Sequence, residues 1–215
     1  YAWFTSYAYC QNDFLEAGLC CTDLMPSEYW KIVDRGNGQV TFKDREGNDV
    51  YGENNYVIWQ SDVHKKFVLG FTGTRDGMTQ FIEQGIYQSL VVIDSNNPQY
   101  RANEYDVQWM KKILDQLYSP EHINMFRAHP DYQVVFTGHS LGGACAVYMA
   151  FMMLYWPQYN FNSNLRPQVI TYGGYRSLNG DAVQFLEARA DVYRVIHYAD
   201  TIPETFHCQK DDQGN

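Results

Sequence analysis

The sequence lacks the features that mark several large classes of protein. No apolar run approaches the roughly 18 residues that a membrane-spanning helix requires. Basic residues are few, with 16 Lys and Arg against 25 Asp and Glu. The formal net charge of −9 argues against nucleic acid as a partner, because phosphate binding needs clustered basic side chains. Paired Cys-x-x-Cys motifs and glycine-rich phosphate loops are absent, so neither a metal ion nor an organic cofactor is expected.

Internal repeats and low-complexity segments are also missing, and the residues that are there suit one packed domain. The 215 residues are 45% hydrophobic and 19% charged, which supports a core and argues against disorder. This length fits a single α/β domain over residues 1–215 better than two domains. The sequence begins at Tyr1 with no Met and no basic, apolar leader, as expected of a mature or trimmed chain.

The five cysteines are Cys10, Cys20, Cys21, Cys145 and Cys208. Four of them lie near the ends of the chain, where cross-links would fasten the termini to the body of the protein. That distribution favours a secreted protein in an oxidising compartment. Cys145 lies in the most apolar stretch and is expected to be a buried free thiol.

Strand and helix signals follow one another along the chain. Strands are expected over residues 39–43, 56–60, 66–71, 132–137, 168–172 and 192–197. Helices are expected over residues 78–90, 104–118, 141–155 and 179–190. Residues 61–65 are typical of a hairpin turn. From residue 132 onward strands and helices alternate, which implies right-handed crossovers and a largely parallel sheet of the α/β class. Functional groups should then gather at the carboxyl ends of the strands.

The segment Thr137–Gly143 contains Gly138-x-Ser140-x-Gly142 between an expected strand and an expected helix. This pattern is typical of a nucleophile elbow, in which a strained serine projects its Oγ from the end of the sheet. The two glycines lack Cβ atoms and let strand and helix pass close together. The N–H of Leu141, at the helix start, would be one oxyanion-hole donor. Ser140 is therefore the predicted nucleophile. The alternative is an ordinary βα turn with a surface serine.

Three motifs in order resemble the class 3 lipases, the fungal-type family that also includes feruloyl esterases and phospholipases. They are residues His129–Ala144, Thr171–Arg176 with Asn179, and Arg194–Pro203. The resemblance begins at Tyr7–Cys10 and covers most of the chain. It implies an α/β-hydrolase fold, with a predominantly parallel central sheet, helices on both faces and a lid helix. It also implies that this domain lacks a C-terminal part that the family has.

The resemblance also implies roles for further residues. Asp200 matches the acid of the catalytic triad, and Thr74 matches the residue that supplies the other oxyanion donors. Thr74 also follows the strand over 66–71 at its carboxyl end, which independently suits that role. A plain turn residue is the alternative for Thr74.

Residues 75–90 correspond to the family's lid. Its apolar residues, at helical spacing, are Met78, Phe81, Ile82 and Ile86. A lid would turn them toward the active site when closed and toward lipid when open, whereas a merely core-facing helix has the same spacing.

The chain departs from the family pattern at three positions. Thr72 stands where the family usually has Arg, Tyr175 where it has Pro, and Leu178 where it has Gly. These differences affect packing more than chemistry, and they indicate a distant branch whose substrate preference differs.

The residue that would activate Ser140 is the least determined part of the site. The six histidines are His64, His122, His129, His139, His197 and His207. The first three are expected at the wrong end of the sheet, and His139 is held in the elbow beside Ser140. His197 is expected within a strand, buried and hydrogen-bonded. His207 follows the acid, as the order Ser, acid, His requires. The base is therefore His207 or a histidine beyond residue 215, and a homologue without catalysis is the remaining alternative.

In the family, a Tyr-Cys near the amino end commonly bonds a cysteine near the carboxyl end. The resemblance thus suggests a Cys10–Cys208 disulfide, with a partner farther downstream as the alternative. Cys20 and Cys21 are adjacent and not expected to bond each other.

These inferences predict a carboxylic ester hydrolase that acts through an acyl-Ser140 intermediate. Triacylglycerol lipase is the leading activity. Feruloyl-type esterase or phospholipase is the alternative within the family, and an inactive lipase-like binding protein is the alternative from another class. The expected partner is a lipid or ester substrate at a lipid–water interface, with no nucleic acid and no transmembrane segment. The protein is expected to be a secreted monomer.

Overall fold

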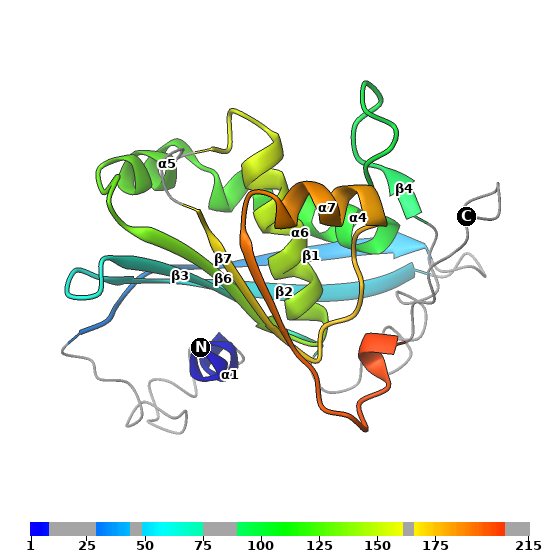
Figure 1. The fold of residues 1–215 in the computed structure, drawn as a ribbon, viewed down its shortest axis with the longest axis horizontal. Coiled ribbons are helices and arrows are strands. Elements are labelled where there is room, and N and C mark those ends of the chain that lie inside the picture. Colours follow the sequence, from blue (N-terminus) through cyan, green and yellow to red (C-terminus); the bar gives the residue numbers. More distant parts are fainter. Residues whose placement is uncertain (9–28, 44–48, 75–89, 161–165, 205–215) are drawn as a thin grey trace.

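The computed structural model describes residues 1–8, 29–43, 49–74, 90–160 and 166–204 (Figure 1). Within these ranges a six-stranded sheet has the order β1-β2-β3-β6-β7-β8, and β4 pairs with β5 in a small separate sheet. The strands of the main sheet are β1 Lys31–Lys43, β2 Asp49–Ser61, β3 Lys66–Phe71, β6 Gln133–His139, β7 Gln168–Tyr172 and β8 Asp191–Val195. The small sheet consists of β4 Leu90–Val92 and β5 Arg101–Asn103. Leu90, expected to end a helix, therefore begins a strand instead.

The main sheet is mostly parallel, as predicted. Strands β3, β6, β7 and β8 pair in parallel, whereas β1 with β2 and β2 with β3 pair antiparallel. The two kinds of pairing follow from the connections. The short turn over residues 62–65 joins β2 to β3 as the expected hairpin, whereas parallel neighbours need a longer crossover. Within the six-stranded sheet of the described residues, only β2 runs against the other five strands.

Helices cover both faces of the sheet, which also confirms the prediction (Figure 1). They are α1 Ala2–Ala8, α4 Glu104–Leu117, α5 Pro120–Arg127, α6 Leu141–Tyr155 and α7 Gly180–Glu187, with the 3-10 helix η2 over Ile202–Glu204. Helix α1 packs on one face, and α4 to α7 lie on the other. Among the described helices, none is long and apolar enough to cross a membrane.

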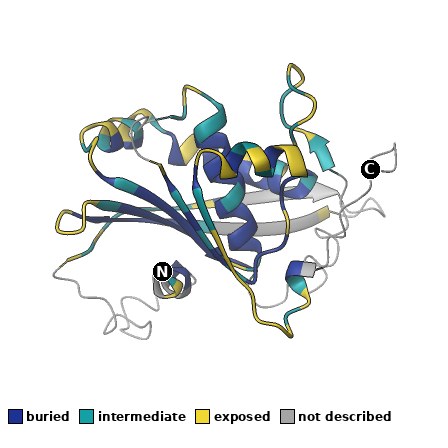
Figure 2. Cartoon of the chain, in the orientation of Figure 1, coloured by how far each residue is buried: buried dark blue, intermediate teal, exposed yellow. Residues whose placement is uncertain are grey.

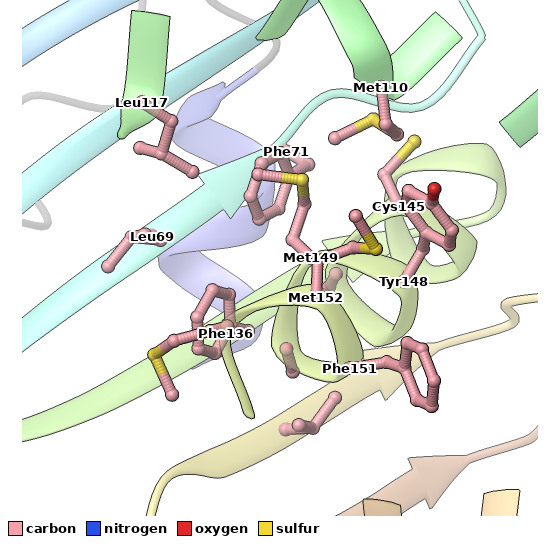
Figure 3. Close-up of a cluster of buried hydrophobic side chains, with 14 of the residues drawn as sticks. Leu69, Phe71, Met110, Leu117, Phe136, Cys145, Tyr148, Met149, Phe151 and Met152 are labelled. Carbon is pink, nitrogen blue, oxygen red and sulfur yellow. The ribbon is translucent and has the colours of Figure 1, made fainter. Parts of the chain in front are cut away.

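The core is divided by the sheet into two parts. The larger part lies between the sheet and α4 to α7, with α6 at its centre and most of that helix buried (Figure 2). Burial on all sides explains why α6 has an unbroken apolar sequence instead of an amphipathic one. The Cys145 thiol is buried in this core and forms no disulfide, as predicted, and it lies beside Met110 and Tyr148 (Figure 3). The smaller part packs α1 against the other face, where Phe4 contacts Trp59.

Local sequence explains where most helices begin. Asn103 caps α4 by accepting a hydrogen bond from the Tyr105 N–H, and Asn179 caps α7 through the Ala182 N–H. Helix α5 was not among the predicted helices, although Ser119 as its cap and Pro120 in its first turn are typical start signals. The expected helices over 104–118 and 179–190 are confirmed as α4 and α7 with slightly earlier ends.

Candidate active site

Ser140 lies in a sharp turn between the carboxyl end of β6 and the start of α6. Its φ of 55° and ψ of −124° place it in a region that side chains rarely adopt, and such a conformation costs about 1–3 kcal/mol. Hydrogen bonds hold it there. The Ser140 N–H donates to the Tyr172 carbonyl at 2.9 Å, and the Ser140 carbonyl accepts from the Gly143 N–H at 2.9 Å. The strand–turn–helix geometry expected around Ser140 is therefore present.

The two glycines of the elbow are required by close backbone contacts. A Cβ atom on Gly138 would lie 2.1 Å from the Gly142 carbonyl oxygen. A Cβ on Gly142 would lie 2.3 Å from the carbonyl oxygen of Phe71, the last residue of β3. Real Cβ atoms do not approach this closely, so only glycine fits at either position without movement. The second contact also brings the carboxyl end of β3 directly against the elbow.

Thr74 lies three residues after the end of β3, at the same end of the sheet as the elbow. Its Oγ1 is buried and has no hydrogen-bond partner among the described residues. A buried hydroxyl normally finds a partner, so an unpaired one is open to a ligand. Two residues earlier, Thr72 behaves differently. Its Oγ1 accepts from the Asn55 N–H at 2.9 Å, and its N–H donates to the Asn55 carbonyl at 3.0 Å.

Leu141 is the first residue of α6, and its side chain is buried. The first N–H groups of a helix have no partner within the helix, so they point out at the elbow with the positive end of the helix dipole. The Leu141 N–H begins α6, and Thr74 follows β3, whose carboxyl end packs against α6 at Gly142. Both groups are therefore candidate donors near the elbow.

Asp200 lies beyond β8, in the turn that leads into η2. Its N–H donates to the His197 carbonyl at 2.9 Å, and its Oδ1 accepts from the Ile202 N–H at 3.0 Å. Its Oδ2 lies against Gly173, where it would be 2.6 Å from a Cβ atom on that glycine. Gly173 directly follows β7 and has a φ of +56°. The Asp200 carboxylate therefore reaches the end of the strand that neighbours the elbow.

The ring of His139 faces the same glycine. Its Nε2 would lie 3.7 Å from a Cβ on Gly173, so this imidazole and the Asp200 carboxylate share one small area. The position of His139 in the elbow was predicted, but its proximity to Asp200 was not. The sequence carries no local signal for this proximity. It follows from the parallel pairing of β6 and β7, which places His139 opposite Tyr172, the residue before Gly173.

Two other histidines lie at the opposite end of the sheet, as predicted. His64 is exposed in the hairpin turn before β3 and stacks on Trp30 at 5.6 Å. His129 precedes β6, and its Nδ1 is 2.9 Å from the Met125 carbonyl. The turn before β3 and the start of β6 are joined there by the Gln133 N–H, which donates to the Lys65 carbonyl.

His122 lies on α5, before β6, and its side chain is mostly buried. Its Nε2 is 3.1 Å from Asp34 Oδ2 on β1, and its Nδ1 is 3.0 Å from the Gln116 carbonyl. Both ring nitrogens therefore already face acceptors of the protein itself.

The expectation that His197 lies buried within a strand was wrong, although its ring is hydrogen-bonded as expected. Strand β8 ends at Val195, so His197 lies in the following turn, and it is exposed instead of buried. Its Nδ1 accepts from the Ala199 N–H at 3.3 Å. The strand ends early because β8 is the last strand of the described sheet and its later residues, including Val195, face solvent.

Some predicted residues lie outside the described part of the chain. These are His207, the cysteines Cys10, Cys20, Cys21 and Cys208, and the lid residues Met78, Phe81, Ile82 and Ile86. Within the described ranges, no group of three or more His, Cys, Asp or Glu side chains is placed to hold a metal ion.

The architecture matches that of solved fungal lipases. The lipase of Rhizopus microsporus var. chinensis superposes with a TM-score of 0.70 at 22% identity, over 96% of this chain and 67% of that chain. The triacylglyceride lipase of Rhizomucor miehei gives a TM-score of 0.70 at 18% identity, over 99% of this chain and 74% of that chain. The fold is therefore that of the α/β-hydrolase lipases.

Sequence comparison narrows the class to a family. The family model described as Lipase (class 3) matches residues 68–210. The chain belongs to the class 3 lipase family. The lipases of Rhizopus niveus and Rhizopus oryzae are each 27% identical over an alignment of 210 residues that covers 93% of this chain. The chain spans 49% of the length of each of these two lipases.

Proposed function

We propose that this chain carries the nucleophile of a carboxylic ester hydrolase, a triacylglycerol lipase that works through an acyl-serine intermediate. The strained elbow at Ser140 is the observation that carries the proposal, because a non-glycine residue with this backbone geometry between a parallel strand and a helix has a cost that an ordinary turn avoids. Family membership supports the same reaction class.

In the proposed reaction the Ser140 Oγ attacks the carbonyl carbon of the ester, while a histidine accepts the hydroxyl proton. The negative charge that develops on the carbonyl oxygen is stabilised by the Leu141 N–H and by Thr74. The histidine then gives its proton to the departing alcohol oxygen as the ester C–O bond breaks. Water, activated by the same histidine, attacks the acyl carbon and releases the fatty acid and free Ser140. No metal ion takes part in these steps.

Asp200 is assigned the role of orienting the histidine. Its Oδ1 is held by the Ile202 N–H, and Oδ2 is left directed at the end of β7, beside the elbow strand. A fixed carboxylate selects the histidine tautomer that can accept the serine proton. His207 is the proposed base within residues 1–215, with a later histidine as the alternative.

The proposed substrate is a water-insoluble ester met at a lipid surface by a secreted protein. The apolar residues at helical spacing after Thr74 support it, because a lid with such a face would contact acyl chains.

A fluorophosphonate probe tests the reaction class, because it phosphonylates an activated serine. We expect one adduct per molecule, located at Ser140, and none in Ser140→Ala. A well-folded wild-type protein that stays unlabelled would instead support the inactive binding protein.

Paired hydrolysis rates test the substrate class. We expect the rate on a long-chain triglyceride to rise sharply once the triglyceride passes its solubility limit and forms an emulsion. A short soluble ester serves as the control substrate. Equal rates with and without an interface would contradict the lipase assignment and favour a soluble-ester esterase.

A further inference from the structure

Asp106 is a carboxylic acid enclosed in the main core. It lies in the first turn of α4, and its exposed fraction is 0%. One carboxyl oxygen accepts a hydrogen bond from the Tyr175 hydroxyl, and Oδ2 has no partner among the described residues. Burial raises the pKa of Asp106 to about 8, although the bond from Tyr175 acts in the opposite direction. A protonated, neutral acid avoids the cost of an unpaired buried charge, so the proton stays on Asp106 in neutral solution.

The groups that face Asp106 come from three elements. They are Tyr105 on α4, Tyr148 on α6, and Tyr175 in the turn after β7. None of these is basic. Two effects hold the pKa of Tyr175 well above its usual range. Burial is the larger one, and the neighbouring Asp106 carboxyl is the second. The Tyr175 hydroxyl therefore remains a donor, and Asp106 is its acceptor.

Tyr175 belongs to the turn that joins the elbow to Asp200. A Cβ on Gly143, in the first turn of α6, would lie 3.1 Å from the Gly174 Cα. The Gly174 carbonyl accepts from Arg194 Nη2 at 2.9 Å, which ties the turn to β8. Gly173, the first residue of this turn, packs against Asp200 Oδ2.

Two glycines in succession, Gly173 and Gly174, have more conformational freedom than any other pair of residues. The side chain of Tyr175, the next residue, is only 5% exposed and extends into the core, where its hydroxyl donates to Asp106. The Tyr175 side chain thus restrains the turn from the core side, in addition to the bonds that Gly173 and Gly174 make with β8.

We propose that Tyr175 is a positioning residue, anchored by Asp106, that fixes the Gly173–Tyr175 turn between the nucleophile elbow and the Asp200 carboxylate. The inference rests on the proposed hydrolase function for its effect on the rate, but not for its effect on the turn. Without the anchor, the two glycines move, and the carboxylate that packs on Gly173 loses its fixed position.

Tyr175→Phe removes only the hydroxyl, and Tyr118→Phe is its matched control. Tyr118 is 6% exposed, and its hydroxyl donates to the Met149 carbonyl at 3.1 Å in the same core, away from the turn. Amide hydrogen exchange read by mass spectrometry compares the two variants with the wild type. We expect exchange over residues 173–178 and 196–202 to speed up about tenfold in Tyr175→Phe and to stay unchanged in Tyr118→Phe. Equal exchange of these segments in all three proteins would overturn the proposal.

Asp106→Asn is the second variant, because its amide oxygen can still accept from Tyr175. It should keep wild-type exchange in both segments at pH 7. If Tyr175→Phe does not fold, this variant and Asp106→Leu, which offers no acceptor, decide the question. Loosening of both segments in Asp106→Leu alone supports the anchor, and identical exchange in the two variants overturns it.

Kinetics provide the readout that a merely structural role would leave unchanged. We expect Tyr175→Phe to lower kcat about tenfold with KM unchanged, and Tyr118→Phe to leave both unchanged, because misplacement of a catalytic group acts on the chemical step. A wild-type protein that neither hydrolyses esters nor labels at Ser140 would contradict the hydrolase proposal alone. The exchange comparison would still decide for or against the anchor.

Discussion

Gly142 lies against the backbone of Phe71 so closely that any side chain on it would collide with the Phe71 carbonyl oxygen, 2.3 Å from the Cβ position. This contact joins two parts of the site that are far apart in the sequence. Phe71 ends the strand that leads to Thr74, and Gly142 is the second residue after Ser140. The relative position of nucleophile and proposed oxyanion donor is therefore set by backbone packing instead of by flexible side chains.

Gly142→Ala should destabilise the protein, because the obstructing atoms are backbone and cannot turn aside. We expect the free energy of unfolding to fall by about 1–3 kcal/mol, the usual cost of overpacking. Gly180→Ala is the control, since a Cβ there meets nothing within 4 Å. At the start of α7 it should raise stability by up to about 1 kcal/mol. Urea unfolding of both variants measures the contrast, and equal stabilities would contradict the close packing at the elbow.

Thr74→Val should separate activity from stability. The Thr74 hydroxyl has no partner among the described residues, so its replacement by a methyl group should leave the free energy of unfolding unchanged or slightly higher. The rate of ester hydrolysis should fall by a factor of about 100–1000 if the hydroxyl stabilises the oxyanion.

Thr72→Val is the matched control for that change. The Thr72 hydroxyl is bonded to the Asn55 backbone, so this variant should lose about 1–2 kcal/mol of stability. Its hydrolysis rate at a temperature where it stays folded should match the wild type. The opposite pattern, with Thr72→Val inactive and Thr74→Val active, would remove Thr74 from the oxyanion hole.

Asp106→Asn should change how stability depends on pH. The folded protein keeps a proton on Asp106 up to about pH 8, whereas an ordinary Asp has a pKa of 3.8. Between these values the unfolded chain binds fewer protons than the folded one, so the contribution of Asp106 is fully present below about pH 4 and is lost as pH rises toward 8. The stability of Asp106→Asn minus that of the wild type should therefore grow with pH by up to about 1.4 kcal/mol per unit across this range.

Asp94→Asn provides a control of the opposite sign. Asp94 is half-buried, and hydrogen bonds from Tyr155 and then Asn97 lower its pKa. Its stabilising contribution is therefore present at neutral pH and lost as the solution is acidified below the usual Asp range. Unfolding free energies from urea titrations between about pH 2 and about pH 9 distinguish the two carboxyls. A flat difference for Asp106→Asn would show that Asp106 titrates normally.

The parts of the fold that were predictable had strong local signals. Strand β3, strand β7 and helix α6 have the predicted bounds, because each is a dense apolar run that ends just before a polar residue, a glycine or, for α6, Trp156 and Pro157. The elbow was predictable because its glycine spacing answers a local steric demand. Helix α5 was missed for a different reason, since its few apolar residues did not stand out as a periodic run despite a clear start at Ser119 and Pro120.

Features that depend on distant residues could not be predicted. The burial of His197 was inferred from an apolar run, but whether a strand is covered depends on its place in the sheet, and β8 is the last strand of the part described. The bond between Asp106 and Tyr175 joins residues 69 positions apart. Its only trace in the sequence was a tyrosine at a position where the resemblance to class 3 lipases implies proline.

The identity of the base is the remaining test of the proposed triad. We expect His207→Ala to slow fluorophosphonate labelling of Ser140 at least about a thousandfold, because a serine without a general base is a poor nucleophile. His197→Ala is the informative comparison, since His197 is exposed and close in sequence to Asp200 at the carboxyl end of β8. His64→Ala, at the opposite end of the sheet, should label at the wild-type rate. Loss of labelling in His197→Ala alone would transfer the role of base to that residue. A Ser140 that is unreactive in residues 1–215 and reactive in a longer chain would assign it to a later histidine.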